Sequence, residues 1–273
     1  MLLAASLSLS YLEGDMRREI AGAITGLVIG VASQGSLAAT FNVVTDFNNT
    51  GSQPAAGNPF TYGTETSLNT GFALLPNFEV GSCSAGSGQC TSNGGTLANY
   101  YLDQSISGPS VGKVATGGPL NFANAFIVPS NVLMMMPGNP GDPFNTPGIV
   151  VTRFTAPEAG IFNITGSFID LQAASVSLAV LVNGSVAFSS EFSGGGGSGT
   201  RPFSINSVLL GQGMTIDFAV DSLGARNNDV LGLMAQIAPP APVPIPPIGG
   251  GLFGLILASM GLLGWWRRRI ADA

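Results

Sequence analysis

Residues 176–188 read Val-Ser-Leu-Ala-Val-Leu-Val-Asn-Gly-Ser-Val-Ala-Phe, and this stretch decides the fold. Apolar side chains recur at every second position from Val176 to Val182, which is the period of a strand with one buried face. Asn183-Gly184 follows directly and favours a two-residue hairpin turn, because both residues tolerate a positive φ. We therefore predict a β-hairpin whose second strand returns over residues 185–188.

The same period of two continues on both sides of this hairpin. We expect further strands at residues 150–155, 162–168, 203–205 with 208–210, 214–220 and 231–237. No stretch between residues 39 and 238 shows a helical period of useful length. The sequence therefore predicts an all-β fold, a β-sandwich of the jelly-roll kind, as one exported domain over residues 39–238.

The first half of this domain carries a weaker signal, because it is rich in Asn, Gly, Pro, Ser and Thr. Short strands fit residues 72–75, 111–114, 122–128 and 132–136. Within the last of these, Met134-Met135-Met136 is interpreted as core filling, and an adaptable binding patch is the alternative.

Four segments of the second half stand in a familiar order. They are Val-Thr-Arg-Phe-Thr-Ala-Pro at 151–157, Gly-Ile-Phe-Asn-Ile-Thr-Gly-Ser-Phe at 160–168, Val-Leu-Val-Asn-Gly at 180–184 and Gly-Met-Thr-Ile-Asp-Phe-Ala-Val at 213–220. Together they resemble a jelly-roll module common in exported PEP-CTERM proteins, which is related in architecture to carbohydrate-binding modules. Asn-Pro-Phe-Thr-Tyr-Gly at 58–63 resembles the opening strand of that module. The resemblance covers residues 58–237 and names no ligand.

The first 38 residues predict a secretory signal peptide. Met16-Arg17-Arg18 precedes an apolar run at residues 20–32, and a small-residue region ends at Ser36-Leu37-Ala38. This is the order of charged, apolar and cleavage regions that signal peptidase and the Sec machinery recognise, with cleavage between Ala38 and Ala39. Because residues 1–15 hold no basic residue, we expect translation to start at Met16, and a long signal peptide is the alternative.

The last thirty-odd residues predict a membrane-spanning tail. Residues 239–247 form a proline-rich spacer, and residues 248–266 carry no charge. At ~1.5 Å per residue, that apolar run comes close to the ~30 Å hydrocarbon core of a bilayer. Arg267, Arg268 and Arg269 then form a basic stop, which sets the end of the chain on the cytoplasmic side. We expect one transmembrane helix at residues 248–266.

Three features follow one another in a known order: the short motif Val243, Pro244, Ile245 and Pro246, the apolar helix, and the basic tail at residues 267–273. This order resembles the sorting signals of PEP-CTERM proteins and is similar to their Val-Pro-Leu-Pro-Ala variant, since Ile245 replaces the usual Glu. The resemblance implies that an exosortase-type transpeptidase recognises the motif and removes the helix. The mature protein would then reach the cell surface or the extracellular matrix. The alternative is a type I single-pass membrane-anchored binding protein that keeps its helix.

Composition excludes several functions. Residues 39–238 hold eleven acidic residues against four basic ones, which argues against nucleic acid as a partner and against docking on anionic lipid. The chain has no histidine, which removes Ser-His-Asp and Cys-His catalysis and histidine metal sites. We therefore predict a non-catalytic protein, with exopolysaccharide as a candidate ligand. A carbohydrate-active enzyme that uses paired carboxylates is the alternative.

The two cysteines, Cys83 and Cys90, lie seven positions apart in a Gly/Ser-rich loop. Outside the cytoplasm an even number of cysteines indicates a disulfide. We predict this bridge and no redox or metal role for the pair.

One group of polar residues is a candidate metal site. Asp221, Asn227 and Asp229 supply short oxygen side chains between two predicted strands, and such side chains are ligands that Ca²⁺ selects. A solvated turn is the alternative, because Asn and Asp also stabilise turns through their own backbone. No other cofactor is predicted.

Overall fold

The hairpin at Asn183-Gly184 is present. It joins β13 (Ser175–Val182) to β14 (Ser185–Ser193) in antiparallel register. Asn183 and Gly184 have φ values of 48° and 79°, so both central residues are left-handed, as a type I′ turn requires. The hairpin was therefore predicted correctly from its local sequence.

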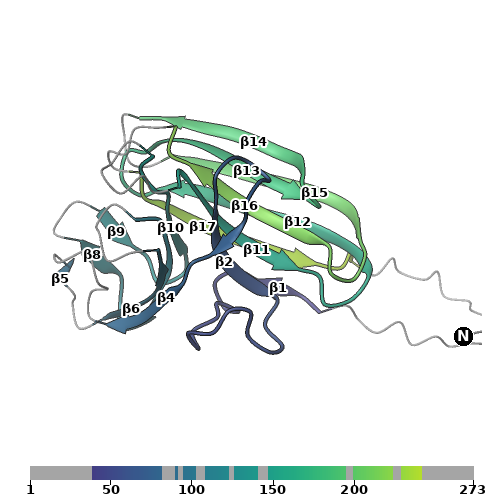
Figure 1. The fold of residues 1–273 in the computed structure, drawn as a ribbon, viewed down its shortest axis with the longest axis horizontal. Coiled ribbons are helices and arrows are strands. Elements are labelled where there is room, and N and C mark those ends of the chain that lie inside the picture. Colours follow the sequence, from purple (N-terminus) through teal and green to yellow (C-terminus); the bar gives the residue numbers. More distant parts are fainter. Residues whose placement is uncertain are drawn as a thin grey trace, which may run out of the picture. The chain divides into compact units, whose positions relative to one another are not determined.

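The computed structural model describes residues 39–81, 90–91, 95–102, 108–122, 126–140, 147–194, 199–223 and 229–241, which belong to one compact unit (Figure 1). The eight-stranded sheet has the order β15 (Thr200–Leu210), β12 (Gly160–Asp170), β17 (Leu231–Ala238), β10 (Leu133–Met136), β7 (Ser110–Thr116), β6 (Thr96–Tyr101), β4 (Asn77–Gly81), with β1 (Phe41–Asn42) also paired to β17. The six-stranded sheet has the order β14, β13, β16 (Thr215–Asp221), β11 (Ile149–Thr155), β2 (Phe60–Glu65), β3 (Ala73–Leu74). A small third sheet joins β5 (Cys90–Thr91), β8 (Leu120–Phe122) and β9 (Phe126–Val128).

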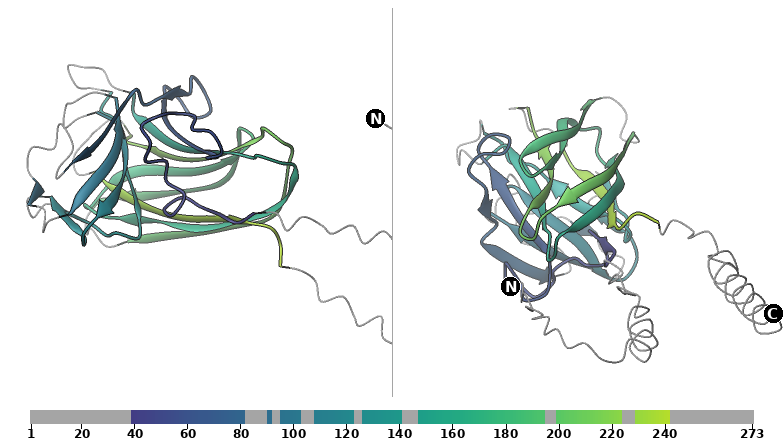
Figure 2. Two further views of the ribbon diagram at one scale, coloured as in Figure 1. Left: turned by 90° about the horizontal axis from the view of Figure 1, so that it is seen from below. Right: turned by 90° about the vertical axis from the view of Figure 1, so that its right-hand side faces the viewer.

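The two large sheets pack face to face as a β-sandwich, and the part of the chain that the structure describes contains strands and no helix (Figure 2). Their inner faces carry alternating large apolar side chains that form one continuous core, among them Phe154, Phe162, Phe168 and Phe218, all fully buried. From β11 to β17 the chain passes repeatedly between the two sheets, so each sheet supplies the buried face that the other needs. The prediction of an all-β sandwich is confirmed.

A second core lies on the outer face of the eight-stranded sheet, beneath the small third sheet. Leu97, Val114 and Met134 pack there against Leu120 and Val128. The three consecutive methionines serve both cores, because neighbouring residues of a strand point to opposite faces. Met134 belongs to the second core and Met135 to the main one, so the prediction of core filling is confirmed.

The outer face of the six-stranded sheet carries a buried ion pair. Arg153 donates from Nε to Asp217 Oδ1 over 2.6 Å and from Nη2 to Asp217 Oδ2 over 2.8 Å. Its Nη2 also lies 3.4 Å from Glu65 Oε1. The ring of Phe72 lies over the guanidinium at 3.7 Å, and Gly63 leaves room for it, since a Cβ there would lie 2.6 Å from that ring. The cluster therefore holds the segment between β2 and β3 against the sheet.

Strand prediction was weaker in the first half. The expected strands near residues 111–114 and 132–136 are present as β7 and β10, and residues 122–128 split into β8 and β9. We did not predict β4 and β6, because polar residues such as Asn77 and Asn99 break their apolar pattern. Both lie at one end of the eight-stranded sheet, where β6 pairs with β7.

We expect Arg153→Met to lower the free energy of unfolding by about 3–5 kcal/mol, because it leaves two buried carboxylates without their cation. Glu65 and Asp217 are 1% and 2% exposed, so water cannot replace the guanidinium. Chemical denaturation of the full-length protein in mild detergent, followed by circular dichroism, measures the loss.

Two controls sharpen this prediction. Glu65→Gln keeps an acceptor for the Asn69 backbone N–H and leaves the Arg153–Asp217 pair in place, so it should lower the free energy of unfolding far less.

The second control is the pH. Burial raises the pKa of Glu65 in the folded protein, so the folded state binds a proton on this carboxylate more tightly than the unfolded chain does. Stability from this group therefore increases as the pH falls through the folded pKa, and the deficit of Arg153→Met should shrink at mildly acidic pH. Equal deficits in both variants would contradict this account of the cluster.

Candidate ligand-binding cleft

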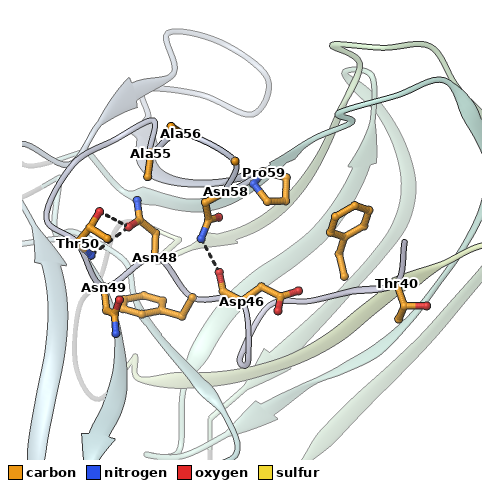
Figure 3. Close-up of a pocket in the computed structure, with 12 residues that line it drawn as sticks. Thr40, Asp46, Asn48, Asn49, Thr50, Ala55, Ala56, Asn58 and Pro59 are labelled. Atoms are coloured by element: carbon orange, nitrogen blue, oxygen red, sulfur yellow. Dashed lines mark hydrogen bonds between the residues drawn. The ribbon is translucent and has the colours of Figure 1, made fainter. Parts of the chain in front are cut away.

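The segment between β1 and β2 forms a cleft on the edge of the sandwich (Figure 3). After β1 the chain leaves the eight-stranded sheet and crosses to the six-stranded sheet, where β2 begins at Phe60. Val43, Val44 and Phe47 anchor this crossing segment in the main core. The cleft has a volume of about 500 Å³ and is lined by Thr40, Phe41, Asp46, Phe47, Asn48, Asn49, Thr50, Ala55, Ala56, Gly57, Asn58 and Pro59.

A reciprocal pair of side chains shapes the first turn of the crossing segment. Asn42 Oδ1 accepts the backbone N–H groups of Val44 at 2.9 Å and Thr45 at 3.2 Å. Asp46 Oδ2 in turn accepts the N–H of Asn42 at 2.8 Å. Short Asn and Asp side chains form such turns because they can bond their own nearby backbone.

Asn48 organises the opposite wall. Its Oδ1 accepts both the N–H and the hydroxyl of Thr50, at 3.1 Å and 2.8 Å, and its Nδ2 donates to the carbonyl of Ser52. Its backbone N–H donates to the hydroxyl of Tyr62 at 2.9 Å. Tyr62 is fully buried, and burial raises the pKa of its phenol, so it stays a neutral hydrogen-bonding group.

Asn58 ties the two walls together, as Figure 3 shows. Its Nδ2 donates to the carbonyl of Asp46 at 2.9 Å, and its Oδ1 accepts the N–H of Phe60 at 2.8 Å. Gln53 adds a second tie to the sheet, because it accepts the N–H of Tyr62 and donates to the carbonyl of Leu75. The walls are therefore held in place before any ligand arrives, which reduces the entropy that binding would cost.

The cleft combines aromatic rings with neutral polar groups. Phe41 packs on Phe154 with ring centroids 5.0 Å apart, and Phe47 packs on Tyr62 at 4.9 Å. Asp46 is the only ionisable residue among the twelve that line the cleft, and none of the twelve is basic. Asn49 is exposed, and its amide makes no hydrogen bond to the described part of the chain. Such a lining suits a neutral ligand rich in hydroxyl groups better than an anion or a cation.

The sequence analysis missed this cleft, although it offered one signal. Residues 40–59 contain four Asn and one Asp, which is unusual for a segment that also supplies three buried apolar residues. Composition alone marked these residues as part of a polar first half. Which of them line a common space depends on long-range packing, and the sequence does not reveal that packing.

The structure describes two of the three residues of the predicted calcium site. Asp221 and Asp229 lie near one end of the sandwich, where each carboxylate accepts a backbone N–H, from Leu223 at 3.2 Å and from Ser175 at 3.0 Å. Asn227 lies outside the described residues. Over the described ranges, no group of three acidic, histidine or cysteine side chains could hold a metal ion. Calcium here stays a prediction. Asp221 bonds the backbone two positions later, as a turn-stabilising residue does, whereas Asp229 ties its segment to the start of β13.

Most other predicted sites fall outside the described residues: Ala38, Cys83, the motif at residues 243–246 and the arginines at 267–269. Ala39 is the first described residue, and Cys90 is described by its backbone only, in β5. In the part of the chain between residues 39 and 241 that is described, no helix is long and apolar enough to cross a membrane. The signal peptide, the disulfide, the transmembrane helix and the sorting motif all stay predictions.

Comparisons with known proteins give only distant structural matches. No protein-family model matches the chain, and no curated protein matches its sequence. Among solved structures, the tandem CBM51 modules of a family 98 glycoside hydrolase from Streptococcus pneumoniae match with 15% identity and a TM-score of 0.31, covering 41% of this chain and 33% of that one. The Podospora anserina GH26-CBM35 β-(1,4)-mannanase matches with 19% identity and a TM-score of 0.27, covering 38% and 22%. TmCBM61 in complex with β-1,4-galactotriose matches with 12% identity and a TM-score of 0.27, covering 70% and 94%.

The names of these three matches all include carbohydrate-binding modules, but scores this low transfer neither a ligand nor a site to this chain. The chain spans about a third of the length of the first of these structures and less of the second.

We expect Asn58→Ala to destabilise the protein by about 1–3 kcal/mol, because it leaves the half-buried Asp46 carbonyl and the buried Phe60 N–H without their partner. Asn49→Ala is the matched control: its exposed side chain has no partner, and the change should stay within about 0.5 kcal/mol. Chemical denaturation of both variants measures the difference. If Asn58→Ala is as stable as Asn49→Ala, the cleft does not depend on the hydrogen bonds of Asn58.

Proposed function

We propose that this chain is a non-catalytic exported bacterial surface or matrix protein whose sandwich domain binds a neutral polysaccharide. The observation that carries the proposal is the lining of the cleft, which joins two aromatic rings to amides and hydroxyls without a basic residue. From β11 to β17 the chain crosses between the two sheets at every connection except the β13–β14 hairpin, which supports the jelly-roll arrangement expected from the sequence.

Sugars complement this lining. Their hydroxyl groups donate and accept hydrogen bonds, and their C–H faces pack on aromatic rings. An Asn amide presents a donor and an acceptor side by side, and a Thr hydroxyl presents both on one atom. Thr40, Asn49 and Thr50 are exposed along the cleft, and Phe41 is half-buried beside them. A pocket with an apolar floor and few, fixed polar groups is the usual form of a small-ligand site.

Catalysis fits the cleft poorly. Hydrolysis of a glycosidic bond normally needs two carboxyl groups on either side of the bond. The cleft offers Asp46 alone, and both of its carboxylate oxygens already accept hydrogen bonds, from the Asn42 N–H and the Thr45 hydroxyl. We therefore propose binding without turnover.

For the route to the cell surface, we propose sorting through the C-terminal signal. The described chain ends at Pro239-Pro240-Ala241, directly after β17, and the sequence then continues into the proline-rich spacer. Proline favours an extended arm at ~3.1 Å per residue. Such an arm would hold the motif at residues 243–246 away from the sandwich, within reach of an exosortase in the membrane.

The binding proposal predicts that the full-length protein binds neutral oligosaccharides in isothermal titration calorimetry, with cello-, laminari-, malto- and manno-oligosaccharides as probes. Asn49→Ala should weaken binding about two- to tenfold, the value of one lost neutral hydrogen bond. Ser189→Ala, an exposed change on β14 far from the cleft, should leave the affinity unchanged. Binding of heparin or polygalacturonate in preference to every neutral probe would contradict the proposal.

The sorting proposal predicts that native protein from the producing cell ends near residues 243–247 and lacks residues 248–273. Intact-mass spectrometry of the surface fraction measures the end directly. Deleting Arg267, Arg268 and Arg269, or replacing Pro244 and Pro246 by Ala, should leave unprocessed precursor. Native protein that keeps Trp265-Trp266 in the membrane fraction would show that the chain is a single-pass membrane-anchored protein.

A further inference from the structure

The outer face of the eight-stranded sheet beside the cleft carries no charged residue. On β15, β12, β17 and β1 the outward positions alternate with core residues such as Phe203, Ile164 and Leu233. All of these outward positions are polar and uncharged, apolar, or glycine. The outer face of the six-stranded sheet differs, because Arg153 and Asp217 lie there.

Strand register aligns polar side chains of this face into a row. Ser204 of β15 lies opposite Thr165 of β12, Thr165 lies opposite Gln236 of β17, and Gln236 lies opposite Asn42 of β1. Neighbouring strands are ~4.8 Å apart, so the four side chains span about 14 Å across the sheet. The sheet therefore presents a straight line of hydroxyl and amide groups.

Three of these four groups are available to a ligand. Ser204, Thr165 and Gln236 are exposed. The side chains of Thr165 and Gln236 make no hydrogen bond to the described part of the chain, and Ser204 contacts Asn206 on its own strand at 3.4 Å. Asn42 is half-buried, and its Oδ1 already accepts the N–H groups of Val44 and Thr45, so it offers a ligand only its Nδ2.

The row leads into the cleft. Asn42 is its last member, and Thr40, which directly precedes β1, lines the cleft. Asp46, which lines the same wall, is bonded to the backbone of Asn42. A chain-like ligand that leaves the cleft past Thr40 would next meet Gln236 and Thr165.

The lack of charged side chains on this face favours a neutral ligand. Arg201 on β15 donates to the Glu191 carbonyl at 3.0 Å and lies over the Phe192 ring, so it is held toward β14. The outward positions of β15, β12, β17 and β1 therefore offer an anionic polymer no cation. Ile161 and Leu209, which lie opposite each other, are 49% and 75% exposed and form a single aliphatic pair. That pair is too small for the apolar centre of a stable protein interface.

We propose that the row Ser204–Thr165–Gln236–Asn42 extends the cleft into an elongated site for a neutral polysaccharide chain. This inference rests on the proposed function of the cleft and adds to it that the ligand is a long glycan. The cleft would hold one short part of the chain, and the row would bond the hydroxyl groups of the sugars that follow.

The test compares disaccharides with hexasaccharides of the same neutral probes, titrated into the full-length protein. The wild type should bind the hexasaccharide at least about tenfold more tightly, which corresponds to one or two added hydrogen bonds. The double variant Thr165→Ala, Gln236→Ala should bind the hexasaccharide only as tightly as the disaccharide and keep the disaccharide affinity. Asn49→Ala should weaken both, and Ser189→Ala neither. Both changes of the double variant are at exposed positions, and an unchanged denaturation midpoint confirms that the fold is intact.

The outcomes separate this inference from the function on which it rests. Equal affinity for both lengths, or a double variant that binds the hexasaccharide like the wild type, overturns the extended site and leaves the cleft in place. Loss of disaccharide binding in the double variant also overturns it, because the row would then belong to the primary site. No binding of any neutral probe overturns the proposed function itself.

Discussion

Tyr62 is the contact on which the arrangement of this domain depends. It lies on β2 of the six-stranded sheet, and its ring packs at 5.0 Å on Tyr100 of β6 in the eight-stranded sheet. The same ring packs at 4.9 Å on Phe47 of the crossing segment, and its hydroxyl accepts the N–H of Asn48. One fully buried side chain thus joins both sheets to the wall of the cleft. Such a ring buries a large apolar area, and its hydroxyl satisfies a backbone group that would otherwise lack a partner.

This contact explains why a loop can serve as a binding site. Loops usually move more than the sheets they connect, and ordering them on binding costs entropy. Here residues 43–59 are tied to the core by Phe47 and Tyr62 and to themselves by the side chains of Asn48 and Asn58. The polar side chains that point outward are therefore carried by a segment that is already in place. The uncharged row on the neighbouring sheet is fixed even more firmly, because strand register sets its spacing.

The part of the fold that depends on local pattern could be predicted, and the part that depends on distant contacts could not. Alternation and the Asn183-Gly184 turn gave the strands of the second half, because each signal lies within a few residues. Residues 203–205 and 208–210 were expected as one strand with a gap in its apolar pattern. β15 continues through that gap, where Ser207 has a φ of 58°. The cleft unites Asp46 with Asn58, twelve positions apart, and Gln53 with Leu75. No period in the sequence encodes those pairs.

The central claim is that one surface without a basic residue, from the cleft across β1, β17 and β12, binds a neutral glycan. Hydrogen–deuterium exchange of the full-length protein, with and without a saturating neutral hexasaccharide, tests it most directly, because it locates the ligand without any substitution. The account predicts added protection in residues 40–59 and in the strands that carry Thr165 and Gln236. Protection confined to the opposite sheet, around β13 and β14, or no protection with any neutral probe, would contradict it.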